Sequence, residues 1–157
     1  MYTASDIADW FLASVDREAG EVITHLKLQK LIYYAQAWSL ALRDQALFEE
    51  DFQAWAHGPV VRSVYDRFSG SSWAALPPPD CDITEIDSET ADLLEDILDS
   101  YGLKSPKQLE SLTHKESPWL DARGHLPPEA RSENIISKES MNTFYKDLYS
   151  KTDGEEQ

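Results

Sequence analysis

Cysteine, glycine and basic residues are all scarce in this sequence of 157 residues. The single cysteine, Cys81, excludes an intramolecular disulfide, and its acidic neighbours disfavour the thiolate that a nucleophile needs. The six glycines form no phosphate-binding loop, so a nucleotide enzyme is not indicated. The four histidines stand alone, without the paired spacing typical of metal sites. We therefore expect no metal and no other cofactor.

The shortage of basic residues leaves a large negative charge. There are 14 lysines and arginines against 29 acidic residues, which gives a net charge of -15. Such a field repels nucleic acids and anionic lipids and attracts basic partners, although acidity that serves only solubility is an open alternative. Direct DNA contact, as in a transcriptional autoregulator, is therefore disfavoured.

No apolar run approaches the ~20 residues that a membrane span requires, and the chain does not open with a secretory signal. We expect a cytoplasmic protein without a membrane segment.

Apolar spacing predicts a mainly helical domain. Thr3 and Thr24 are placed to cap two helices, and the second should extend through Arg43 with a continuous apolar face that includes Leu42. Its polar residues are expected to form a solvated face: Lys27, Lys30, Gln36 and Arg43.

The rest of the chain divides into shorter elements. Alternation predicts an extended segment near residues 48–56, and proline at the first helical position predicts a helix from Pro59. Further predictions are a loop over 69–79, an acidic amphipathic helix that ends at Gly102, short helices after Ser105 and from Ser117, and a last helix capped by Ser137. These elements predict a compact bundle of about six helices in one domain, residues 1–150, with a polar, disordered tail at 151–157.

Two stretches concentrate reactive and aromatic side chains. One is Phe52–Val61, where a large aromatic residue and a tight turn precede a helix; the other is Leu112–Arg123. The second contains His114, Glu116 and Trp119, which could form a contact surface or serve the fold through helix caps and a buried indole. Both interpretations remain open from the residues alone.

The same stretches carry a family resemblance. The run Leu26–Trp38, the run Trp55–Val61 and the pattern in 112–123 occur in an order and spacing that resembles the Panacea domain of SocA-like antitoxins, a family that also includes phage-associated GepA proteins. The likeness extends from about Tyr2 to Tyr149. One departure is His57, where the family more often has tyrosine before Gly-Pro-Val.

The resemblance implies a non-enzymatic antitoxin of a type II-like toxin–antitoxin system, which neutralises a cognate toxin encoded by an adjacent gene. Direct binding of the toxin is the first hypothesis, and delivery of the toxin to a ClpXP-type protease is the alternative. An enzyme that uses His57, His114 and Glu116 is a third. The candidate partner-binding residues are Trp55, His57, Pro59, Tyr65, Asp92, Glu95, Asp96, His114, Glu116, Trp119 and Arg123.

Overall fold

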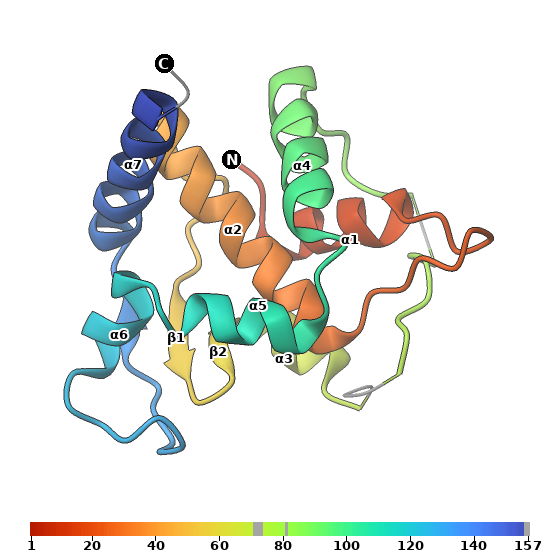
Figure 1. Ribbon diagram of the computed structural model, residues 1–157. Coiled ribbons are helices and arrows are strands. Elements are labelled where there is room, and N and C mark those ends of the chain that lie inside the picture. The colour runs from red at the N-terminus through yellow and green to blue at the C-terminus, as the bar shows by residue number, and fades with distance from the viewer. Residues whose placement is uncertain (71–73, 81, 156–157) are drawn as a thin grey trace.

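One long helix, α2 (His25–Arg43), runs through the centre of the molecule and contacts most other elements. The computed structural model describes residues 1–70, 74–80 and 82–155. Figure 1 shows α1 (Ala4–Ser14) and α4 (Ser88–Tyr101) on one side of α2 and α7 (Lys138–Glu155) on the other. The compact, mainly helical single-domain fold that the sequence predicts is confirmed.

Predicted caps define where several helices begin. Thr3 forms a capping box with Asp6 at the start of α1, and the Thr24 hydroxyl accepts from the Lys27 amide at the start of α2. A second capping box, between Ser105 and Gln108, opens α5 (Pro106–Thr113). Because these bonds satisfy amides that have no partner within the helix, the helix starts could be located from the sequence alone.

The extended segment is one strand of a small antiparallel sheet. Strand β1 (Phe52–Trp55) lies between β2 (Gly58–Val61) and β3 (Ile135–Ile136). The helix predicted to begin at Pro59 is wrong at its start, because Pro59 pairs with Ala54 in the sheet and α3 begins only at Arg62 (Arg62–Phe68). Proline is accommodated there because β2 is an edge strand, where its missing N–H removes no ladder bond.

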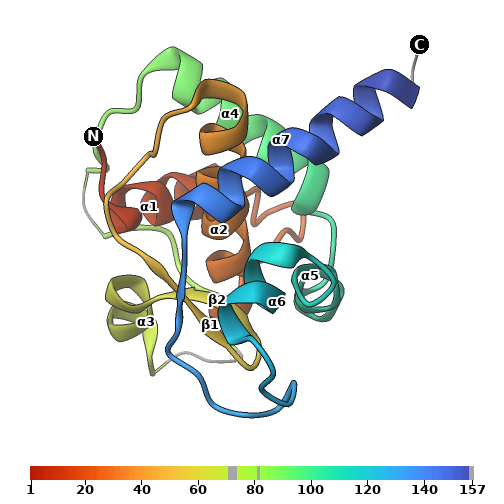
Figure 2. The ribbon, with the colours of Figure 1, turned by 90° about the vertical axis from the view of Figure 1, so that its left-hand side faces the viewer.

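Helices α5 and α6 (Ser117–Arg123) lie beside the hairpin that β1 and β2 form (Figure 2). The α6 segment contacts β1, β3 and α7, so it joins the sheet to the last helix. The Ser137 hydroxyl accepts from the Ser140 amide at the start of α7. The two stretches that the sequence analysis singled out are therefore neighbours in the fold.

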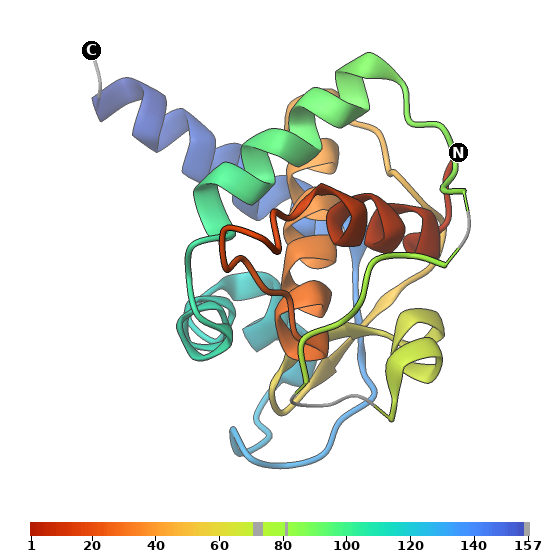
Figure 3. The same cartoon turned by 90° about the vertical axis from the view of Figure 1, so that its right-hand side faces the viewer.

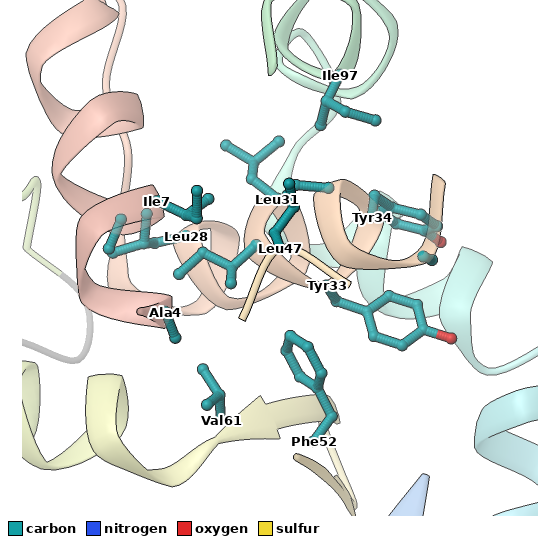
Figure 4. Packing of buried hydrophobic residues seen from close by; sticks show 14 of the residues in the cluster. Ala4, Ile7, Leu28, Leu31, Tyr33, Tyr34, Leu47, Phe52, Val61 and Ile97 are labelled. Carbon is teal, nitrogen blue, oxygen red and sulfur yellow. The ribbon is translucent and has the colours of Figure 1, made fainter. Parts of the chain in front are cut away.

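The core surrounds α2 and is rich in aromatic rings. Figure 4 shows Leu28 and Leu31 near Ile7 of α1, with Tyr33 over Phe52 of β1. The Tyr33 and Phe52 rings meet edge to face with centroids 5.3 Å apart. Leu42, by contrast, is 46% exposed, so its predicted place on the buried face is wrong.

The predicted solvated face of α2 is also wrong at two positions, because Lys30 and Gln36 are buried. Gln36 donates to the Phe48 carbonyl and accepts from the Leu47 amide, at 2.9 and 2.7 Å. A buried side-chain amide is tolerated when its hydrogen bonds are made, and here it orders the segment that leads into β1.

The described residues form seven helices rather than about six. Residues 74–80 belong to no helix or strand apart from a bridge between Thr24 and Ala75, as the predicted loop requires. Helix α7 runs to Glu155 and so includes most of the predicted tail, while Cys81 lies outside the described residues. None of the described helices is both long and apolar enough to cross a membrane.

Candidate protein-binding site

The hairpin presents an aromatic surface beside α3. The Trp55 and Tyr65 rings lie with centroids 4.7 Å apart, and the Arg62 guanidinium lies 5.9 Å from the Trp55 ring. His57 is in the two-residue turn, and its side chain is 72% exposed. Trp, Tyr and Arg are the residue types most enriched among binding hot spots.

These residues line one side of a surface hollow of about 620 Å³, which we call the hairpin hollow. The loop that precedes β3 supplies the other side. The lining residues are Trp55, Ala56, His57, Arg62, Tyr65, Glu129, Arg131, Ser132 and Glu133. The hollow thus combines an aromatic wall with charged groups of both signs.

Arg123 holds the two sides of the hollow together. It is 3% exposed, and its guanidinium donates to the Ala54 carbonyl of β1 at 2.8 Å. The same guanidinium donates to the Pro127, Pro128 and Ala130 carbonyls of the facing loop, at 2.8, 3.3 and 2.7 Å. A planar guanidinium with several fixed donors suits this role better than a lysine.

Trp119 supports the hairpin from behind. Its indole N–H donates to the Trp55 carbonyl at 2.9 Å, and the Arg123 guanidinium lies 4.8 Å from its ring. The His114 imidazole stacks on the Trp119 ring, with ring centroids 4.0 Å apart and nearly parallel planes. Burial lowers the pKa of His114, so the neutral imidazole is favoured.

A buried lysine lies under the hairpin turn. Lys30 is 1% exposed, and its amine has no hydrogen-bond partner among the described residues. Burial lowers its pKa from 10.5 to about 8, against the attraction of Glu110. Gly58 has a φ of +114°, and a Cβ at this position would come within 2.5 Å of the Lys30 Cε and 3.1 Å of the Thr113 hydroxyl. Glycine is therefore required where the turn approaches the lysine.

Glu116, the residue at the start of α6, joins α6 to two other helices through tyrosines. Its Oε1 accepts from the Tyr34 hydroxyl of α2 at 2.6 Å and from the Tyr145 hydroxyl of α7 at 3.0 Å. Burial raises the pKa of this carboxyl, although both hydroxyls oppose the shift. Tyr34 also stacks on Tyr101 of α4 at 4.0 Å, and burial raises the pKa of Tyr101 to about 12. Glu116 thus acts as a structural centre of the core.

Comparisons with known proteins agree on a family. Residues 28–120 match the family described as "Antitoxin SocA-like, Panacea domain". The chain belongs to this family. It is also 31% identical over 116 residues to Antitoxin SocA of Caulobacter vibrioides (strain NA1000 / CB15N), a match that covers 62% of this chain and 58% of that protein. No solved structure matches. The predicted resemblance is confirmed, over a shorter span than Tyr2–Tyr149.

The Panacea fold divides the candidate residues into three groups. Trp55, His57 and Tyr65 line the hairpin hollow together. Pro59, His114, Glu116, Trp119 and Arg123 lie behind it or in the core, where they have the contacts described above. Asp92, Glu95 and Asp96 are exposed on α4, which Figure 1 shows at the opposite end of the molecule from the hairpin.

The three residues of the enzyme hypothesis have different partners. The His57 imidazole lies 3.2 Å from the Glu110 carboxyl, His114 stacks on Trp119, and Glu116 bonds to the two tyrosines. In the part of the chain that the structure describes, no three His, Cys, Asp or Glu side chains are grouped as metal ligands. The observed contacts give Glu116 and His114 supporting roles in the fold.

Several residues of the hollow were missed by sequence reasoning. Arg62 follows the hairpin directly, so its i, i+3 spacing to Tyr65 in α3 could have indicated a shared surface. Arg131 and Glu129 could not have been found, because their loop reaches β1 only through tertiary contacts: the bonds of Arg123, the bond from the Ala54 amide to the Asn134 carbonyl and the pairing of β3 with β1. Lys30, which lies under the hairpin turn and does not line the hollow, was missed because its charge suggested a solvated position.

Proposed function

We propose that this protein is an antitoxin that neutralises a cognate protein toxin by binding it directly. Family membership supports the antitoxin role, and the chain matches 58% of the length of Antitoxin SocA. The observation that supports direct binding is the hairpin hollow: it has a half-buried aromatic wall and two arginines, and the residues that support the hairpin are buried behind it. Preorganised surfaces of this kind bind with little loss of conformational entropy.

The toxin is proposed to be the product of an adjacent gene. It should insert a side chain between the Trp55–Tyr65 wall and the facing loop. The Arg62 guanidinium, which pairs with Asp66 and Glu133 in the free protein, would exchange these exposed ion pairs for polar groups of the toxin at the rim. The net charge of -15 favours a basic toxin surface over a nucleic acid as the direct partner. Neutralisation would then follow from covering a functional surface of the toxin.

The first experiment is co-expression of the chain with the product of the adjacent gene, scored for growth rescue and for co-purification. Arg62→Glu, at an exposed position of the hollow, should weaken the complex about tenfold or more. The matched control is Lys146→Glu on α7, whose side chain is 49% exposed.

Equal affinity of the two variants would remove the hollow from the interface. Rescue without a complex, accompanied by disappearance of the toxin in a host that has a ClpXP-type protease and not in one that lacks it, would contradict neutralisation by binding and support delivery to the protease. Absence of both toxicity and rescue would contradict the toxin–antitoxin assignment for this gene pair.

A further inference from the structure

A second hollow lies on a different face of the molecule, and we call it the Leu103 hollow. It has a volume of about 420 Å³ and is lined by residues of the α1–α2 loop and of the C-terminal end of α4. Figure 3 shows the ribbons of these two segments near each other. Leu103 is 90% exposed and Val22 is 55% exposed. Val15 and Leu98, both partly buried against the core, also line the hollow.

The backbone around this hollow is held in place. The Lys27 amine donates to the Gly102 carbonyl, which ties α2 to the linker that carries Leu103. On the opposite side, the Leu76 amide donates to the Ile23 carbonyl at 2.8 Å, and Arg17 donates to the Leu76 carbonyl at 3.2 Å. These bonds therefore hold in place the backbone that carries the exposed apolar side chains.

The rim of the hollow is acidic. Glu21 and Asp99 line it, and Asp16 and Glu18 are exposed on the same loop as Glu21. The exposed face of α4 extends the negative surface, because residues 80–99, which include most of α4, contain no basic residue. Lys27, which also lines the hollow, is already bonded to the Gly102 carbonyl. The chemistry that complements this surface is an apolar side chain flanked by positive charge.

We infer that the Leu103 hollow binds a short basic segment of the toxin, in which an apolar side chain contacts Leu103 and Val22 while neighbouring lysines or arginines face Glu21, Asp99 and α4. This inference rests on the proposed function and adds a second contact surface to it. The apolar contact supplies affinity, because two exposed side chains become buried. The acidic rim supplies specificity and a faster association rate.

Two pairs of variants test the inference with the purified toxin. Leu103→Asp should weaken binding about tenfold or more, whereas Leu42→Asp, at a 46% exposed leucine on α2 outside the hollow, should not. Glu21→Lys with Asp99→Lys should lower the association rate about three- to tenfold and reduce its dependence on salt. The charge-matched control is Glu139→Lys with Asp147→Lys on the exposed side of α7.

Overlapping peptides of the toxin identify the segment itself. Those that bind the wild-type chain and lose binding to Leu103→Asp should contain an apolar residue between lysines or arginines. Wild-type affinity of Leu103→Asp, or acidic peptides as the ligands, would overturn the inference. If Arg62→Glu still weakened the complex in that case, the proposed function would stand; absence of any complex with the wild-type chain would remove both.

Discussion

Replacing Lys30 with methionine should stabilise this protein at neutral pH, and the gain should shrink as the pH rises. The Lys30 amine is buried, has no hydrogen-bond partner among the described residues, and has its pKa lowered from 10.5 to about 8 by burial. Methionine keeps the length and most of the volume of the side chain and removes the charge. Replacing a buried charge with an apolar group of similar shape is often stabilising.

The magnitude follows from the size of the pKa shift. A difference of about 2.5 units at about 1.4 kcal/mol per unit corresponds to a free energy of about 3 kcal/mol. Below pH 8 the folded and unfolded states both hold the proton, so the folded state bears this whole cost. Between about pH 8 and 10.5 the unfolded state binds more protons than the folded state, and the stability of the wild-type chain therefore rises with pH through this lysine.

The assay is urea unfolding, followed by tryptophan fluorescence, at pH 7, 8.5 and 10. Lys30→Met should exceed the wild type by about 1 to 3 kcal/mol at pH 7, and the difference should fall to about a quarter of that value at pH 10. Lys107→Met, at an exposed position, is the matched control and should show no pH-dependent difference. A Lys30→Met variant that is less stable at pH 7, or a difference that does not change with pH, would refute the reasoning.

Three other substitutions test the supporting residues, each by the same unfolding assay. Glu116→Gln retains an acceptor for both tyrosine hydroxyls and removes a carboxyl whose pKa is raised by burial, so it should change the free energy of unfolding by less than about 1 kcal/mol. Glu116→Leu leaves both hydroxyls without this acceptor and should cost about 2 to 4 kcal/mol. Equal losses in both would contradict the hydrogen-bond account. Arg123→Lys should cost about 2 to 3 kcal/mol and increase proteolysis of the 124–134 loop, because one amine cannot satisfy four carbonyls; an unchanged cleavage rate would argue against this role. Gly58→Ala should cost about 2 kcal/mol or more, and Lys30→Ala in the same chain should recover only the steric part, since the positive φ remains; full recovery would show that φ carries no strain.

Local chemistry explains why much of the fold could be predicted from the sequence. Thr3, Thr24 and Ser105 bond to amides within their own first helical turn, so the positions of these helices depend on neighbouring residues only. The apolar spacing of α4 likewise needs no distant partner to be recognised. The family motifs identified the Panacea domain because residue types and their order are properties of the sequence.

Tertiary contacts decided what the local pattern could not. Pro59 became part of a strand because β1 pairs with it across the hairpin, and Lys30 and Gln36 became buried because the hairpin and the segment before it cover α2. The division of the motif residues between a surface and its support also depends on distant contacts: Trp55 and Tyr65 face the hollow, whereas Arg123 and Trp119 bond to the hairpin backbone from α6. Sequence alone determined which side chains this protein has for binding; only the tertiary structure decided which of them face outward, because burial is a property of the packed elements together.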